Sequence, residues 1–146
     1  MEQTNQTSVH KVKTKLDFKD SKYATGRRKR SIAKVWVKKG TGNIHVNGLK
    51  MDEYFKRPVH QIIVTRPLEI SEVATNYDVK CSVKGGGLSG QAGAIILGIS
   101  KALISHDESL KKNLKKNKLT TRDSRVVERK KYGHKKARRS FQFSKR

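Results

Sequence analysis

Acidic residues are scarce in this sequence. Its 146 residues include 12 Asp and Glu against 35 Lys and Arg, which leaves a formal net charge of +23. A compact chain with such a surplus repels itself, and the repulsion falls when a polyanion neutralises the excess. The composition therefore predicts a polyanionic partner, which on charge alone could be RNA, DNA or an anionic membrane.

Long hydrophobic runs and cysteine pairs are also missing. No run reaches the roughly 18 apolar residues of a membrane-spanning helix, and the N-terminal ten residues lack the basic-then-hydrophobic order of a secretory signal. Cys81 is the single cysteine and is expected in the core, while the five histidines are isolated from one another. We therefore expect a soluble intracellular protein with no disulfide, no metal and no other cofactor.

A glycine cluster is the one feature that suggests an enzyme. Gly85, Gly87 and Gly90 fit G-x-G-x-x-G, but a dinucleotide fold needs a further strand after the helix, and a lysine-rich run follows Asp107 instead. The glycines could serve only a tight turn and close packing. Alternatively, the backbone N–H groups of a helix N-terminus beside Lys84 could bind an RNA phosphate. In either case we expect no enzymatic activity.

The positive charge is concentrated near the C-terminus. Residues 111–146 carry a net charge of +14, whereas residues 1–110 carry +9. An extended state separates these like charges until phosphates neutralise them. We therefore divide the chain into a flexible polar leader (1–21), a globular RNA-binding body (22–107) and a basic tail, helical or extended (108–146).

Hydrophobic spacing predicts an α+β body. A period of two marks the strand Tyr77–Lys84, and steps of three and four residues mark the following helix. Together the elements form a small two-layer sandwich. They are a β-hairpin of residues 32–37 and 44–46, a helix from Pro58 that Pro67 ends, the strand Tyr77–Lys84, and a helix over residues 88–105.

Two basic blocks predict contact with RNA. One precedes the first predicted strand, and the other runs through the tail, where Phe141 and Phe143 could stack on bases. A solvated charge run is the alternative for one block alone, but two blocks favour RNA. The candidate rRNA-binding residues are Arg27, Arg28, Lys29, Arg30, Lys84, Gly85, Gly86, Gln91, Arg122, Arg125, Arg129, Lys130, Lys131, Lys135, Lys136, Arg138, Arg139, Phe141 and Phe143.

Three separate motifs, in order along residues 22–146, resemble the bacterial-type small-subunit ribosomal protein nine family. They are the segment YATGRRKR from Tyr23, the segment VKGGGLSGQAGA from Val83, and a tail that ends in QFSKR. The resemblance implies a body on ribosomal RNA of the small-subunit head and a βαβ unit with a left-handed crossover. It also implies that the tail reaches the peptidyl-site tRNA, where Lys145 and Arg146, beside Ser144, contact the anticodon stem-loop.

The same resemblance sets the expected partners and location. They are small-subunit ribosomal RNA, peptidyl-site tRNA and neighbouring head proteins, with neither DNA nor a membrane, in a bacterial cytoplasm rather than an organelle. Two other classes stay open from the residues alone. Charge alone is the motive for a DNA-compacting or free RNA-chaperone protein, and the glycine cluster alone is the motive for a nucleotide-binding enzyme, which we do not expect.

Overall fold

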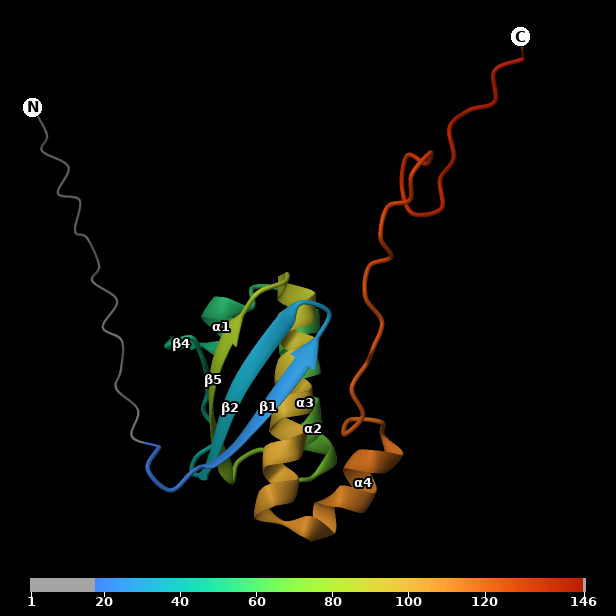
Figure 1. Cartoon of the computed structure of the whole chain (residues 1–146). Coiled ribbons are helices and arrows are strands. Elements are labelled where there is room, and N and C mark those ends of the chain that lie inside the picture. The colour runs from blue at the N-terminus through green and yellow to red at the C-terminus, as the bar shows by residue number, and fades with distance from the viewer. Residues whose placement is uncertain (1–17, 146) are drawn as a thin grey trace, which may run out of the picture.

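The computed structural model describes residues 18–145. Most of the predicted leader, residues 1–17, and the terminal Arg146 lie outside the described residues. Figure 1 shows a body of strands and helices from which the residues after helix α4 (Lys111–Lys116) run outward. The architecture is mixed α+β with a five-stranded sheet.

The sheet has the order β1-β2-β5-β3-β4. Adjacent strands pair antiparallel, except β3 and β5, which pair in parallel. The chain between β3 and β5 contains a helix. The strands are β1 (Lys22–Arg28), β2 (Ser31–Lys39), β3 (Ile44–Val46), β4 (Leu49–Lys50) and β5 (Tyr77–Lys84).

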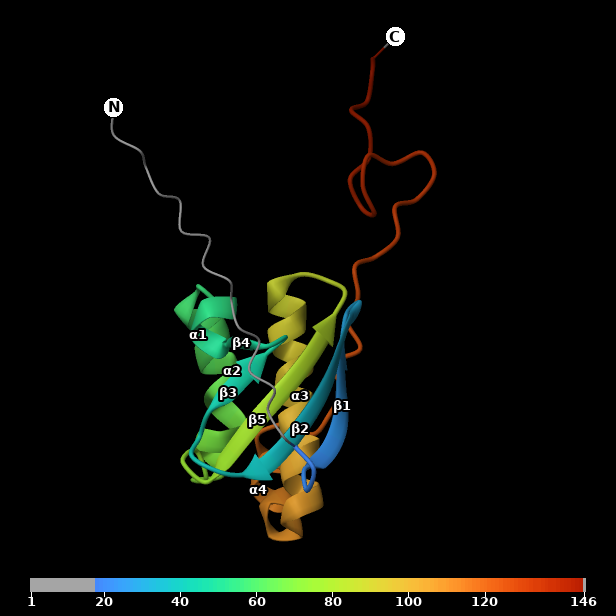
Figure 2. The ribbon, with the colours of Figure 1, turned by 90° about the vertical axis from the view of Figure 1, so that its left-hand side faces the viewer.

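Two helices cover one face of the sheet, as Figures 1 and 2 show from different sides. α3 lies against β1 and β2 and also packs on α2. The other helices are short and lie at the ends of the body. The helices are α1 (Met51–Tyr54), α2 (Pro58–Ile70), α3 (Leu88–His106), the 3-10 turn η1 (Glu108–Leu110) and α4 (Lys111–Lys116).

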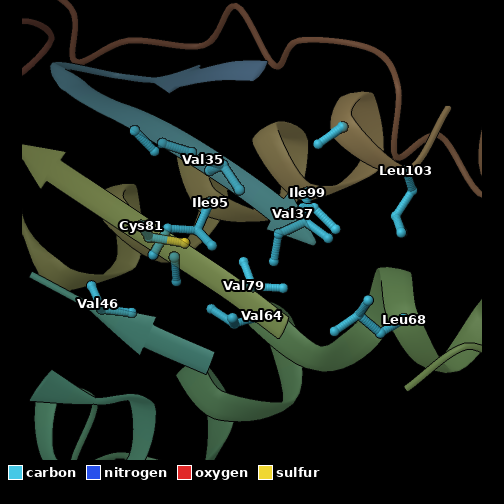
Figure 3. Close-up of a cluster of buried hydrophobic side chains, with 14 of the residues drawn as sticks. Val35, Val37, Val46, Val64, Leu68, Val79, Cys81, Ile95, Ile99 and Leu103 are labelled. Atoms are coloured by element: carbon cyan, nitrogen blue, oxygen red, sulfur yellow. The ribbon is translucent and has the colours of Figure 1, made fainter. Parts of the chain in front are cut away.

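The core lies between the sheet and these two helices (Figure 3). Alternate residues of β2 and β5, among them Val35, Val37 and Val79, are fully buried there against Ile95 and Ile99 of α3. The inner sheet face therefore follows the period of two that a half-buried strand requires. Burial of this kind stabilises each Val or Ile side chain by about 1.5–3 kcal/mol relative to exposure.

Cys81 belongs to this core, as expected from the sequence, and burial raises the pKa of its thiol far above the ordinary value. The core also includes Leu114 and Leu119, which are buried beyond residue 107. Packing on the body thus continues into the segment that the sequence assigned to the tail.

The predicted hairpin of residues 32–37 and 44–46 is wrong, because β5 lies between β2 and β3. The loop after β2 is held by Asp78 of β5, whose carboxylate accepts hydrogen bonds from Thr41 N at 3.0 Å and Asn43 N at 2.8 Å. β2 instead forms its hairpin with β1, which the sequence did not predict as a strand. Cations and Gly26 obscured the strand pattern there.

The prediction that the helix beginning at Pro58 ends at Pro67 is also wrong. α2 continues through Pro67 to Ile70, and Pro67 is buried among core residues. The absent N–H of proline removes one helical hydrogen bond, but burial of Pro67 and Leu68 holds the last turn in place. The strand Tyr77–Lys84 and the helix that follows it are confirmed.

α3 is long and apolar enough, by length and composition, to pass for a membrane-spanning helix. Of the apolar window, 61% is buried inside the protein, as in the core helix of a soluble domain. The helix therefore gives little support to a membrane role.

Candidate nucleic-acid interface

The turn between β5 and α3 exposes glycine backbone at the start of the longest helix. Gly85 and Gly86 have φ of +74° and +62°, a left-handed conformation that suits glycine. α3 follows Gly87 with no side-chain cap, so the first N–H groups of the helix have no side-chain acceptor. Such N–H groups, with the positive end of the helix dipole, attract anions.

Side chains from α1, from α3 and from the turn between β3 and β4 brace this turn. The Tyr54 hydroxyl donates a hydrogen bond to Gln91 Oε1 at 2.7 Å, and Gln91 Nε2 donates to the Gly85 carbonyl at 3.2 Å. Asn47 pairs with the backbone of Val83, donating to its carbonyl at 3.1 Å and accepting from its N–H at 2.8 Å. These side chains thus hold the end of β5 and the first residue of the glycine turn in place.

A dinucleotide-binding site needs a strand after the helix, and the sequence predicts none there. α3 leads into η1 and α4, and no strand follows it in residues 107–145. The Gly90 Cα lies close to Ser31, because a Cβ added there would be 2.8 Å from Ser31 Oγ. The third glycine of the motif therefore allows close packing against β2, as the structural interpretation of the cluster predicts.

Arg28 connects the first basic block with the beginning of the tail. Its side chain crosses α3 at Gly93, where a Cβ would lie 2.8 Å from Arg28 Nη1. Its Nη2 lies 3.3 Å from the Asp123 carboxylate. Asp123 also accepts from Arg125, with Nη2 to Oδ2 at 2.9 Å. Hydrogen bonds from the Arg125 side chain and backbone hold the pKa of Asp123 far below its usual range.

A cavity of about 440 Å³ opens beside this ion pair. Its apolar wall comes from α2 and α3, and a single carboxylate, Asp123, faces the cations in its lining. Five cations line it: Arg27, Arg28, Arg66, Lys118 and Arg125. Sequence patterns predicted three of them, but Arg66 falls within a helix and Lys118 within a lysine-rich run, so neither stood out.

A groove of about 870 Å³ runs between the glycine turn and residues 126–130. The glycines Gly86, Gly87 and Gly90 form one side of it. Residues from both predicted basic blocks meet here, although about one hundred residues of sequence separate them. The cations of the groove are Lys29, Arg30, Arg129 and Lys130, with Glu128 as its carboxylate.

Farther along the tail, the cations are held by local contacts. Glu128 pairs with Lys131 at 3.2 Å and with Arg138 at 2.7 Å. Lys135 N donates to the Arg139 carbonyl at 2.8 Å, and Lys135 Nζ lies 5.6 Å from the centre of the Phe141 ring. These contacts place cations next to an aromatic ring that is 60% exposed.

The other predicted tail residues do not gather into a cavity with the body. Phe143 is 87% exposed. The exposed remainder comprises Arg122, Lys136, Arg139, Ser144 and Lys145. Lys84, Gly85 and Gln91 instead lie at the braced turn.

Among residues 18–145, no group of three or more His, Cys, Asp or Glu side chains could hold a metal ion. The groove and the cavity suit oxyanions, because the N–H donors of their Arg and Lys side chains match phosphate oxygens. A comparison with protein families gives one further finding. The family model described as ribosomal protein S9/S16 matches residues 26–146, more than half of the chain.

Proposed function

Because the chain belongs to the ribosomal protein S9/S16 family, we propose that it is a head protein of the small ribosomal subunit whose tail reaches the peptidyl-site tRNA. Family membership already gives a structural, RNA-binding ribosomal protein rather than an enzyme. The finer roles concern individual residues. The body and most of the tail would bind ribosomal RNA, and Ser144, Lys145 and Arg146 would contact tRNA.

The cation-lined groove between the glycine turn and residues 126–130 is the observation that best supports RNA binding. It brings together Lys29, Arg30, Arg129 and Lys130 beside the uncapped start of α3. Four cations and free backbone donors in one concave surface fit a bent phosphate backbone better than a single ion.

The cavity beside Arg28 offers a second phosphate site. Arg28 Nε is buried and makes no hydrogen bond within the described residues. A phosphate oxygen in the cavity would satisfy this donor, and Arg27, Arg66 and Lys118 would share the remaining charge. Ribosomal RNA that follows the tail along the body could thus occupy both sites.

The tail supports the tRNA contact through its reach and chemistry. Residues 120–145 contain no helix, and the chain runs away from the body (Figure 1). A segment of this kind can pass through RNA to a distant site and lose its entropy only on binding. Arg146 would clamp a tRNA phosphate with two parallel donors, and Lys145 would add a point charge.

Two finer features of the fold and location belong to the same proposal. The parallel β3–β5 pair, connected through α2, would have the left-handed crossover of the related ribosomal proteins. The protein would act in a bacterial cytoplasm, next to other proteins of the small-subunit head, rather than in an organelle.

The proposal is tested by deleting Lys145 and Arg146. Reconstituted small subunits that contain the shortened chain should assemble normally, yet bind peptidyl-site tRNA more weakly, because two phosphate contacts are lost. Filter binding of labelled tRNA to programmed subunits measures the affinity, and sedimentation measures assembly.

The matched control is a double substitution, Lys112→Ala with Lys116→Ala, which removes the same charge from α4. Its subunits should bind tRNA as the wild type does. Unchanged tRNA affinity of subunits with the shortened chain would contradict the proposed tRNA contact. Failure of the full-length chain to enter small subunits would contradict the proposed ribosomal function.

A further inference from the structure

Within the part of the chain that the structure describes, residues 18–145, no helix lies over one face of the sheet. The helices cover the face that carries Val35, Val37 and Val79, so the alternate residues of each strand point the other way. We name this open side the outer face. Strand pairing aligns five of its residues in one row across all five strands: Tyr23, Trp36, Lys80, His45 and Lys50.

Aromatic rings stand at one end of this row. The rings of Tyr23 and Trp36 lie 5.3 Å apart at an angle of 42°, and Tyr23 is 49% exposed. Large aromatic side chains on a sheet are usually covered, either by the rest of the domain or by a binding partner. Within residues 18–145, Phe18 reaches the neighbouring Lys80, whose Nζ lies 5.7 Å from the Phe18 ring centre.

The outer face carries almost only positive charge. The strands contribute one carboxylate to this face, that of Asp78. It already accepts hydrogen bonds from the N–H groups of Thr41 and Asn43. A positive sheet face selects an anionic occupant and repels a basic one. Its cations are Lys34, Lys38, Lys50, Lys80 and Lys84.

The outer face is continuous with the glycine turn. Arg27, Ile32 and Lys84 lie opposite one another in the register, and Ile32 is 42% exposed. Lys84 immediately precedes Gly85, whose added Cβ would lie 2.6 Å from the Arg30 carbonyl. An RNA strand on the groove beside the turn could therefore continue directly onto the sheet.

We propose that the outer face binds an unpaired segment of RNA, with a base stacked at Trp36 and Tyr23 and phosphates on Lys34 and Lys80. The inference rests on the proposed ribosomal function and adds a contact surface to it. Stacking suits unpaired bases because their faces are exposed, whereas the bases of a duplex are covered by their neighbours. An acidic protein segment would match the charge but would leave the paired rings without stacking partners.

Trp36 makes the proposal directly measurable, because it is the single tryptophan of the chain. The full-length protein is titrated with small-subunit ribosomal RNA transcribed in vitro, and binding is followed in parallel by filter retention. Trp36 emission should fall along the same curve, and its quenching by acrylamide should weaken by about threefold when a base covers the ring. A fully paired RNA duplex, used as a second probe, should give binding with little change in emission.

Variants test the two contacts separately. Trp36→Ala should weaken binding by about tenfold through lost stacking, and Lys34→Ala by a factor of about three through a lost phosphate contact. Lys101→Ala, an exposed cation of α3 on the helical side, is the matched control and should bind as the wild type does. Circular dichroism and urea unfolding confirm that each variant is folded. If Trp36→Ala does not fold, the emission of wild-type Trp36 and the RNA affinity of Lys34→Ala still test the outer-face contact.

The possible outcomes separate this proposal from the ribosomal one. Retention of ribosomal RNA with unchanged Trp36 emission and accessibility would overturn the outer-face contact and leave ribosomal binding intact. Quenching that appears only in whole subunits, and not with the RNA alone, would also overturn it, because a protein would then be the occupant. Failure to retain ribosomal RNA at all would overturn the proposed function and this inference with it.

Discussion

Arg28 of β1 and Asp123 form an ion pair, with Nη2 and Oδ2 3.3 Å apart, at the place where the chain leaves the body. Both side chains are partly exposed, so the pair contributes little to global stability. Its effect is local, because it holds the start of the tail beside the cavity that Arg27 and Arg66 also line. RNA phosphates entering this cavity would compete with Asp123 for Arg28.

The pKa of Asp123 provides the first prediction. Hydrogen bonds from the Arg125 side chain come first among the causes of its lowered pKa, and the charge of Arg28 contributes less. The attachment of the tail is therefore present above the unfolded-state pKa of about 3.9 and is lost only as pH falls through the lower folded value. Carboxyl ¹³C NMR should show Asp123 titrating well below the ordinary aspartate value of about 3.9.

Substitution of the two arginines ranks their effects. Arg125→Gln should raise the Asp123 midpoint toward that of an ordinary aspartate, although the backbone N–H of residue 125 still donates, and Arg28→Gln should raise it less. Equal shifts, or a wild-type midpoint near 4, would contradict this geometry, since an unpaired exposed carboxyl titrates at about that value.

Gly26 provides the second prediction, because it lies in β1 where α3 comes closest. A Cβ there would press on the Ala94 carbonyl and lie 2.6 Å from Gly98 N. These are backbone atoms and cannot turn aside as a side chain could. Gly26→Ala should therefore lower the free energy of unfolding by about 2–4 kcal/mol, near the upper end for overpacked sites, as measured in urea.

The control for this substitution is Gly87→Ala. No atom outside its immediate chain neighbours lies within 4 Å of an added Cβ at Gly87, and its φ of −103° is accessible to alanine. Gly87 is the N-cap of α3, where alanine is less favourable than glycine, so the loss in unfolding free energy should be about 1 kcal/mol or less, still below that at Gly26. Similar losses at both glycines would show that α3 does not pack on β1 as described.

These close packings also show how far the sequence alone determines the fold. The strand Tyr77–Lys84 could be predicted because apolar and polar residues alternate over its whole length. β1 could not, because its inward positions include Gly26 and Arg28, whose fit depends on α3 rather than on their own hydrophobicity. Sheet order is likewise non-local, since β5 separates β2 from β3 through pairings that no short pattern contains.

The candidate interface was predictable to a similar degree. Consecutive cations such as Arg27 to Arg30 stand out in a sequence, and so do the glycines. Arg66 and Lys118 became part of the cavity only because α2 and the residues after α4 meet beside α3. The bracing of the turn by Tyr54 was equally hidden, because Tyr54 and Gln91 are 37 residues apart.

Tyr54 provides the third prediction. Tyr54→Phe removes the 2.7 Å hydrogen bond to Gln91 and so frees the side chain that holds the Gly85 carbonyl. Stability should fall by about 1 kcal/mol, the usual worth of one hydrogen bond. RNA affinity should fall by a larger factor than Gln61→Ala produces, because Gln61 binds the Phe55 carbonyl away from the turn.

A double-mutant cycle separates bracing from general destabilisation. If Tyr54 acts through Gln91, Tyr54→Phe should weaken RNA binding far less in a Gln91→Leu background than in the wild type. Additive losses would mean that the two side chains act independently and that the hydrogen bond does not position the turn.

Removal of the tail provides the last prediction. Leu114 and Leu119 belong to the core, so a chain cut after Leu119 keeps every buried apolar residue of the body and should unfold cooperatively near the wild-type midpoint. The cut removes 11 cations. The dependence of log affinity on log salt should therefore become shallower by about 0.7–0.9 for each lost phosphate contact. A slope that stays the same would place the RNA contacts on the body alone, whereas a loss of cooperative unfolding would show that the tail holds the body together.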